Sequence, residues 1–105
     1  MSLPDVVYAA ADGLQVTLAA STWQHIQQRH PEVRLADIEQ ALTRPIRICD
    51  HKTAPDQQVY EGARGTTRWS AVFPVVIVER QGASTGVVVT ARLSRRPYQG
   101  VQRWP

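Results

Sequence analysis

The sequence predicts an α+β domain in which two N-terminal helices pack on a twisted, four-stranded antiparallel sheet, preceded by a short N-terminal hairpin. Two observations carry this prediction. Helix start and stop signals bracket two segments between Ser21 and Thr43. The segments that follow alternate apolar and polar residues, as strands do, and glycines or prolines separate them.

Two helices are expected in the first half of the chain. Ser21 and Gln24 match a capping box, in which both side chains satisfy free backbone amides at a helix start. Pro31 disfavours helix for the residue before it, so this helix is expected to end near His30. The second helix is expected from about Leu35 to Thr43, where apolar residues recur at helical spacing.

The strands are expected on both sides of this helical pair. Asp12-Gly13 is a hairpin turn signal between two short strands, Val6–Tyr8 and Leu14–Leu18. Four further strands are expected after the helices, at Ile46–Ile48, Gln58–Glu61, Trp69–Glu79 and Gly86–Leu93. Within the third of these, Pro74 has no amide to donate, so the strand is expected to bend there or to lie at an edge.

The last expected strand has two different faces. A period of two places an apolar set on one face, made of Val87, Val89, Ala91 and Leu93. The other face carries Val88, Thr90 and Arg92. Thr90 and Arg92 are therefore expected to project together, either into water or into a site.

Length and composition limit the class of protein. With 105 residues, the chain fits a single domain over residues 1–105, and its one cysteine, Cys49, excludes an internal disulfide. The longest apolar run, Ala71–Val78, is too short to span a bilayer, and no secretory signal opens the chain. We therefore expect action in the cytoplasm, without a membrane, and the sequence leaves the oligomeric state open.

The charge is uneven along the chain. Twelve Lys and Arg residues oppose nine acidic ones, and the net charge is +3. From Arg80 to the end there are five arginines and no acidic residue. Arginine grips phosphate with two parallel hydrogen bonds, so this basic third of the chain favours a polyanionic partner such as RNA.

The first helix carries two imidazoles on different sides. His25 and Arg29 lie one turn apart on one face, whereas His30 points roughly 140° away from His25 at 3.6 residues per turn. His25 either works in a cleft beside Arg29 or is a solvated surface residue. His30 is either a fallback for that role or a structural residue at the helix end.

Metal and nucleotide chemistries lack the residues they require. The two helix histidines are five apart and no cysteine pair exists, so a zinc site is not expected. The acidic residues are scattered and no Gly-rich phosphate loop occurs. Histidine, arginine, tyrosine and threonine remain. This set suits RNA cleavage without metal or cofactor, because RNA supplies its own 2′-hydroxyl nucleophile.

The segment Trp23–Glu32, WQHIQQRHPE, resembles the helix motif of the phage-associated barnase/EndoU/colicin/RelE-like (BECR-fold) nuclease domains. Val88–Ala91 is similar to the Thr-Ala strand of that group, and the collinear resemblance covers about residues 14 to 104. Arg92 stands where the family pattern often has tyrosine. The resemblance implies helices on a four-stranded antiparallel sheet and metal-independent RNA cleavage by toxins, with tRNA among the targets.

Residues and resemblance together predict a toxin-like endoribonuclease that forms a 2′,3′-cyclic phosphate. The expected catalytic residues are His25, His30, Thr90, Arg92 and Tyr60, and the expected substrate-binding residues are Arg29, Arg47 and Arg95. The expected partners are an RNA substrate and a cognate immunity protein or antitoxin, with delivery inside a larger toxin or phage protein as one route. The alternative is a non-catalytic RNA- or protein-binding module on the same fold.

Overall fold

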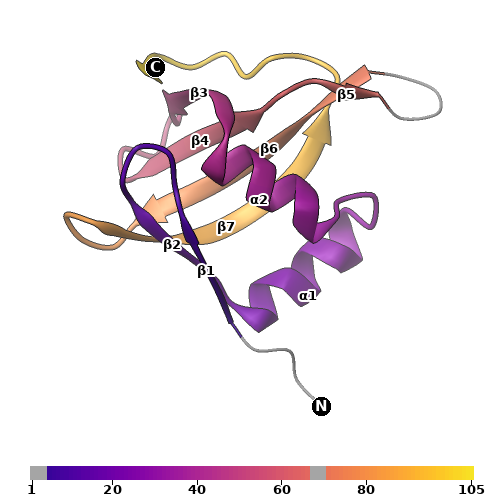
Figure 1. Cartoon of the computed structure of the whole chain (residues 1–105), viewed down its shortest axis with the longest axis horizontal. Helices are drawn as coiled ribbons and strands as arrows, with labels where there is room; N and C mark the ends of the chain where they lie inside the picture. The colour runs from indigo at the N-terminus through magenta and orange to yellow at the C-terminus, as the bar shows by residue number, and fades with distance from the viewer. Residues whose placement is uncertain (1–4, 67–70) are drawn as a thin grey trace.

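Two helices and one mixed sheet make up the fold, as the computed structural model shows for residues 5–66 and 71–105 (Figure 1). The helices are α1 (Ala20–Arg29) and α2 (Leu35–Thr43). The strands, in chain order, are β1 (Val6–Ala9), β2 (Gln15–Leu18), β3 (Pro45–Asp50), β4 (Gln57–Gly62), β5 (Gly65–Thr66), β6 (Ala71–Arg80), β7 (Thr85–Ser94) and β8 (Gln102–Trp104).

The sheet is larger than the sequence predicts. Its strands follow the order β1-β2-β7-β6-β4-β3-β8, with β5 beside β6 off this path. The four expected strands are its centre, β3, β4, β6 and β7, and their mutual pairings are antiparallel. The prediction of four strands is wrong because both edges of this centre accept a further strand. The N-terminal hairpin joins β7 through parallel pairing of Gln15 with Thr85, and β8 joins β3.

The first helix begins without the expected capping box. Its N-cap is Ala19, with no side-chain cap, so Ser21 lies inside the first turn and the capping-box prediction is wrong. The Asp5 carboxylate accepts the Ala20 N–H instead, at 3.0 Å. The end of α1 is as expected: its last residue is Arg29, and the His30 N–H still donates to the Ile26 carbonyl at 2.6 Å before Pro31.

The second helix has its expected bounds, and a hydrogen bond from the backbone of Arg34 caps its start. The Arg34 N–H donates to the Asp37 carboxylate at 2.9 Å. Ile38, Ala41 and Leu42 are buried, whereas Leu35 is 40% exposed, so the buried stripe is narrower than its spacing suggests. Neither helix of the described ranges is long and apolar enough to cross a membrane.

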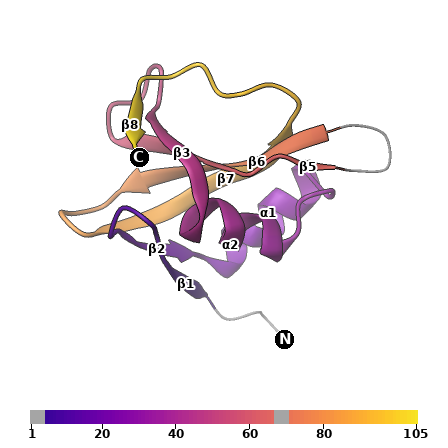
Figure 2. The same cartoon turned by 45° about the horizontal axis from the view of Figure 1, so that its top comes forward.

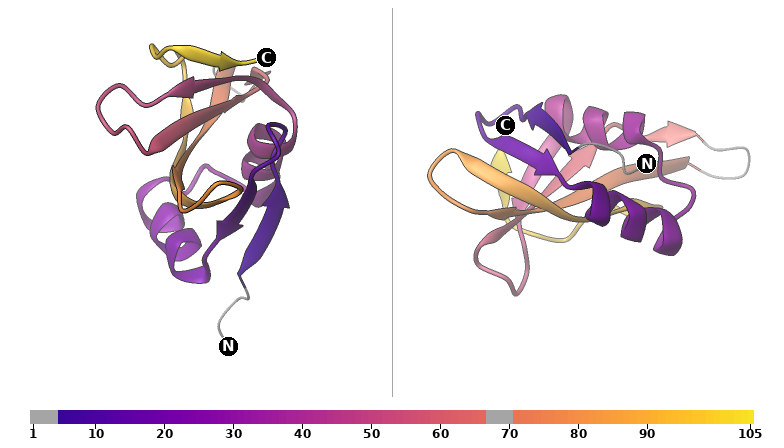
Figure 3. Two further views of the ribbon diagram at one scale, coloured as in Figure 1. Left: turned by 90° about the vertical axis from the view of Figure 1, so that its left-hand side faces the viewer. Right: turned by 90° about the horizontal axis from the view of Figure 1, so that it is seen from below.

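The main core lies between the helices and one face of the sheet (Figure 3). The helices contribute Trp23, Ile26, Ile38 and Leu42 to it. Cross-strand partners Ile48, Tyr60, Val76 and Ala91 form the facing row of the sheet. Because partners in an antiparallel sheet share a face, residues next to them on each strand point to the opposite side.

A bulge in β7 changes the predicted faces of that strand. Ile77 pairs with Thr90, but Val78 pairs with Val88, so Val89 is an extra residue between two pairs. Val88 therefore lies in the main core, and Val89 is 37% exposed. The prediction that Val87, Val89, Ala91 and Leu93 share one face is wrong for Val87 and Val89, and it is right for Ala91 and Leu93, which face the main core. Thr90 and Arg92 do share the face opposite the helices, because they lie after the bulge.

The long strand predicted around Pro74 is β6. Its predicted first residue, Trp69, lies outside the described residues. Pro74 pairs with Leu93 on one side, so it is inside the sheet rather than at an edge. On the other side of β6, Val72 pairs with β5 and Val75 pairs with β4. Pro74 therefore lies at the point where the partner of β6 changes from β5 to β4. A residue without an N–H is tolerated at such a break.

The chain after β7 returns across the molecule. Residues 95–105, here called the C-terminal strap, run from the end of β7 to β3 and finish in β8 (Figure 2). The Asp50 N–H donates to the Val101 carbonyl at 2.8 Å, and Arg103 Nε donates to the Asp50 carboxylate at 2.6 Å. The expected basic tail is therefore part of the sheet.

We expect Gly62→Ala to destabilise the protein by about 1–3 kcal/mol, the usual effect of overpacking a core. A Cβ at Gly62 would lie 2.6 Å from Pro74 Cγ and 3.2 Å from Ala41 Cα, where α2 crosses the sheet. Urea unfolding measures the difference. Gly65→Ala is the control, since the atom nearest to a Cβ at Gly65 would be the Val72 carbonyl oxygen at 3.9 Å. Equal unfolding midpoints for wild type and Gly62→Ala would contradict the packing described here.

Candidate functional site

The sheet face turned away from the helices carries a row of charged residues. Arg47, Glu61, Val75 and Arg92 are successive cross-strand partners on β3, β4, β6 and β7. Neighbouring strands lie about 4.8 Å apart, so Glu61 and Arg92 are roughly 10 Å apart across Val75. Charged side chains from three strands, β3, β4 and β7, therefore lie on this one face.

A small apolar cluster covers the middle of this face. It consists of Val59, Val75 and Ile77, with Phe73 and Tyr98 packed against it. Tyr98 belongs to the C-terminal strap, so the strap lies on the sheet through this ring. The cluster is separate from the main core and buries the second face of β4 and β6.

Tyr98 is fixed at both of its ends. Its N–H donates to Glu61 Oε2 at 2.8 Å. Its hydroxyl oxygen accepts the Lys52 N–H at 3.0 Å. The Lys52 ammonium lies 5.5 Å from the centroid of the same ring, within the range of a cation–π interaction. The strap and the loop between β3 and β4 are thus joined through one tyrosine.

A recess between the strap and the sheet is basic. It has a volume of about 170 Å³ and is lined by Lys52, Val75, Arg92, Ser94, Arg96, Pro97, Tyr98 and Gln99. We call it the basic pocket. Its lining holds three cationic side chains and no carboxylate. Among the described residues, no ion pair involves Lys52, Arg92 or Arg96, so their charges remain available to an anion.

His51 stands next to the basic pocket. Its ring centroid lies 6.2 Å from that of Tyr98. Its Nδ1 accepts backbone N–H groups of Thr53 at 3.2 Å and Ala54 at 3.0 Å. In the neutral imidazole the proton is therefore on Nε2, and His51 offers a donor rather than a free base.

The helix residues expected at a catalytic site do not line this pocket. His25 and Arg29 are exposed on α1. His30 is half-buried, and its Nδ1 lies 3.6 Å from the Glu32 carboxylate. The structure brings Arg92 together with Lys52 and Arg96, not with these α1 residues. The expected meeting of a helix imidazole with Thr90 and Arg92 is not found at the basic pocket.

Tyr60 lies on the helix side of the sheet, inside the main core. It is completely buried, and its hydroxyl donates to both Asp12 carboxylate oxygens, at 2.8 and 3.0 Å. Burial, followed by the hydrogen bond and the negative charge of Asp12, raises the pKa of Tyr60 far above its ordinary range. This hydroxyl links the hairpin turn to β4.

The three remaining predicted residues lie on the strap side. Arg47 Nη2 donates to Glu61 Oε1 at 2.6 Å, so its charge is already compensated and it is not a free substrate-binding group. Arg95 is exposed at the start of the strap. Thr90 is half-buried, one row from Arg92 on the same face. Of the eight predicted residues, only Arg92 lines the basic pocket.

Lys52, Arg96 and Tyr98 were missed by the sequence reasoning. The hydrogen bond between the Lys52 backbone N–H and the Tyr98 hydroxyl spans 46 residues of chain, and no local sequence pattern predicts such a contact. One signal was present: Lys52 is the only lysine in the chain and stands in a polar loop. The sequence predicts a polyanion partner for the basic C-terminal third, but it gives no sign that this segment returns across the sheet.

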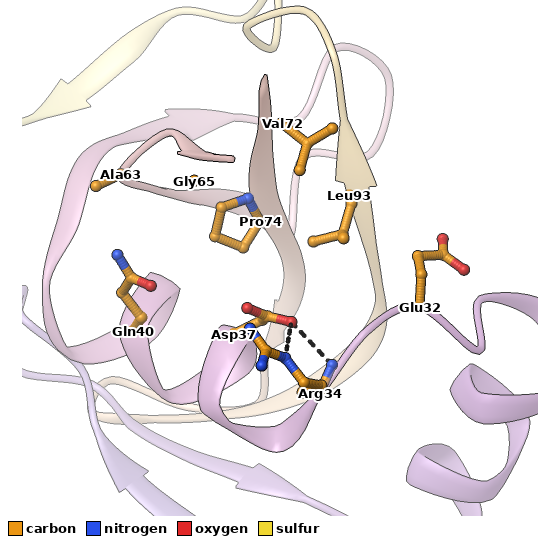
Figure 4. A pocket seen from close by; sticks show the side chains of 9 residues that line it. All are labelled: Glu32, Arg34, Asp37, Gln40, Ala63, Gly65, Val72, Pro74 and Leu93. Atoms are coloured by element: carbon orange, nitrogen blue, oxygen red, sulfur yellow. Dashed lines mark hydrogen bonds and ion pairs between the residues drawn. The ribbon is translucent and has the colours of Figure 1, made fainter. Parts of the chain in front are cut away.

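A second recess opens on the helix side. This groove, about 390 Å³, is lined by Glu32, Arg34, Asp37, Gln40, Ala63, Gly65, Val72, Pro74 and Leu93. Figure 4 shows Val72, Pro74 and Leu93 on the sheet side, facing Asp37 and Gln40 of α2. Asp37 is already bonded to Arg34. Two carboxylates against one arginine make this groove unsuitable for a polyanion.

The basic pocket supplies cations and hydrogen-bond donors. Within the described ranges, no group of three or more His, Cys, Asp or Glu side chains could hold a metal ion. Tyr98 lines the pocket, and because its hydroxyl oxygen accepts the Lys52 backbone N–H, the hydroxyl proton remains as a donor. Arginine forks and a hydroxyl proton together are the groups that bind phosphate oxygens.

The raised pKa of Tyr60 predicts a loss of stability in alkali. Above the ordinary tyrosine pKa of about 10, the unfolded chain releases this proton while the folded chain keeps it, so the free energy of unfolding falls as pH rises. Urea unfolding of wild type and Tyr60→Phe across this range should give a shallower fall for the variant. The raised pKa of Tyr8 leaves a residual fall in both proteins. Parallel curves would show that Tyr60 is ionised in the folded protein.

The chain matches no protein-family model, no curated protein and no solved structure. The resemblance of Trp23–Glu32 to the BECR-fold nuclease domains therefore stays a prediction from that motif.

Proposed function

We propose that the protein binds RNA, and that the basic pocket holds a phosphate of the RNA backbone. The observation that carries this proposal is the convergence of Lys52, Arg92 and Arg96 on one recess without a carboxylate. Three positive groups around so small a volume repel one another unless an anion neutralises them. A phosphate satisfies their donors and their charge together.

The surroundings of the pocket support a polyanion rather than a small acid. Arg95 is exposed next to Arg96, whereas Arg103, further along the strap, is already paired with Asp50. The net charge of the chain is +3, and no acidic residue follows Glu79. An exposed arginine beside one partly enclosed phosphate site suits a chain of phosphates, which binds by releasing its counterions.

The same geometry favours backbone binding over base reading. One side of Tyr98 faces the Lys52 ammonium, and the ring also packs against Val59, Val75 and Ile77. The ring is therefore not free to stack on a base. Contacts to phosphate position a nucleic acid, whereas contacts to bases specify its sequence. We accordingly propose binding with little sequence preference.

Loss of Arg92 or Arg96 should weaken RNA binding and reduce its dependence on salt. A hydrogen bond to a charged group contributes about 1.5–3 kcal/mol, so Arg92→Ala should weaken binding about tenfold or more. For single-stranded RNA, each phosphate contact that is lost should lower the slope of log K against log salt by about 0.7. Fluorescence anisotropy with a labelled oligoribonucleotide at several salt concentrations measures both quantities.

Arg29→Ala is the matched control for this experiment. It removes the same charge from α1, away from the basic pocket. We expect a smaller change in affinity than for Arg92→Ala. If Arg29→Ala weakens binding as strongly as Arg92→Ala, the pocket is not the principal phosphate site. A DNA strand of the same sequence, tested in parallel, shows whether RNA is preferred.

Metal-independent RNA cleavage at the same pocket is the second candidate, and the Tyr98 hydroxyl favours it. The 2′-hydroxyl would attack phosphorus and the bond to the 5′-oxygen would break, leaving a 2′,3′-cyclic phosphate. Tyr98 would protonate the leaving 5′-oxygen, while Arg92 and Arg96 stabilise the phosphorane. The 2′-hydroxyl proton would pass to water, because Nδ1 of His51 already accepts backbone N–H groups.

Incubation with total tRNA in EDTA, followed by end-group analysis, tests cleavage. We expect slow formation of cyclic-phosphate ends, and a loss of about 10²–10⁴-fold in Tyr98→Phe, the usual effect of removing a general acid. A His25→Ala, His30→Ala double variant tests the sequence prediction in the same assay. Cleavage that depends on these imidazoles and not on Tyr98 would move the site to α1. RNA binding without any cleavage would leave the binding function alone.

A further inference from the structure

Glu61 is the one buried charged side chain among the residues that the structure describes, at 1% exposure. It lies on β4, in the centre of the sheet, on the face that the strap covers. Both of its oxygens are used: Oε1 accepts from Arg47 Nη2 at 2.6 Å, and Oε2 accepts the Tyr98 N–H at 2.8 Å. A buried charge is costly unless it is paired and hydrogen-bonded.

Stability alone does not explain this ion pair, in which Glu61 is buried and the Arg47 side chain is 26% exposed. Replacing such a pair by apolar residues of similar volume is often neutral or stabilising. Arg47 adds a further cost, because its Nε is buried and has no hydrogen-bond partner among the described residues. A buried polar group that remains unsatisfied calls for an explanation.

The second bond of Glu61 leads directly to the basic pocket. Tyr98, whose N–H it accepts, lines that pocket together with Arg96 and Lys52. The Tyr98 hydroxyl in turn accepts the Lys52 N–H, so one chain of contacts runs from Glu61 through Tyr98 to the loop that carries the lysine. Without an acceptor on β4, the backbone of Tyr98 would lose its hydrogen bond to the sheet, and the strap would be held near the pocket by the Tyr98 ring and hydroxyl alone and beyond it by the pairing of β8 with β3.

We propose that Glu61 is a positioning residue of the phosphate site, which holds Tyr98 and hence the strap in place, and that Arg47 neutralises it so that the pocket stays cationic. This inference rests on the proposed function, because it assumes an anion in the basic pocket. It also changes the expected role of Arg47. In this proposal the Arg47 guanidinium neutralises the Glu61 carboxylate and does not bind the RNA.

Replacement of the buried pair by methionines separates positioning from stability. In the Arg47→Met, Glu61→Met double variant, two apolar side chains of similar volume fill the site, so folding is expected to survive. The acceptor for the Tyr98 N–H is lost. We expect the Tyr98 and Lys52 amides to lose protection from hydrogen exchange, while the Gln102 amide in β8 keeps it. Inorganic phosphate should bind about tenfold more weakly, as expected when a site loses a hydrogen bond to a charged group.

Two further variants complete the experiment, with heat unfolding measured for each. Glu61→Gln keeps an oxygen acceptor for the Tyr98 N–H but leaves the Arg47 charge uncompensated, so stability should fall while amide protection at Tyr98 persists and phosphate affinity does not decrease. Glu79→Met removes a carboxylate from the same sheet face, in the row of Gln57 and Val87, and should change neither quantity. These results would support positioning by Glu61, since loss of charge alone would not give this pattern.

The outcomes that overturn the inference are distinct from those that overturn the function. If the double variant keeps protection at Tyr98, or if Glu61→Gln loses as much phosphate affinity as the double variant, Glu61 does not position the strap. If the wild-type protein binds neither phosphate nor the oligoribonucleotide, the proposed function is wrong. In that case amide exchange still decides whether Glu61 holds Tyr98.

Discussion

The buried carboxylate of Glu61 constrains much of the strap-side architecture. A carboxylate at 1% exposure in the middle of a sheet requires a cation and a donor at fixed places. Arg47 supplies the cation from β3, and the Tyr98 amide supplies the donor from a segment 37 residues further along the chain. These requirements fix the register of two central strands, and they determine where the C-terminal strap crosses the sheet.

The two faces of the sheet are therefore chemically different. The helix side is a continuous apolar core with an acidic groove at its rim. The strap side holds a thin apolar cluster, a compensated ion pair and a recess with three unmatched cations. A polyanion is attracted to the second side and repelled from the rim of the first. This division separates the residues predicted on α1 from Arg92, and it explains why they do not share a site.

Some local signals in the sequence were sufficient for the elements next to them, although the capping box at Ser21 was not. Pro31 and Asp12-Gly13 give the end of α1 and the hairpin turn, because both act through the backbone of neighbouring residues. The bulge at Val89 was not predictable, since a run of three valines fits either register equally well. The contact between Lys52 and Tyr98, and with it the basic pocket, depends on a fold that brings remote segments together.

The parallel pairing of Gln15 with Thr85 orders events during synthesis. The hairpin of β1 and β2 leaves the ribosome long before β7 exists, so its free edge has no sheet to join while most of the chain is still being made. Contacts between such remote segments close slowly, because the loop between them must first lose its entropy. The nascent chain therefore completes its sheet late, after β7 has emerged. Until then the edge of β2 has unpaired backbone groups that can pair with a strand of another chain.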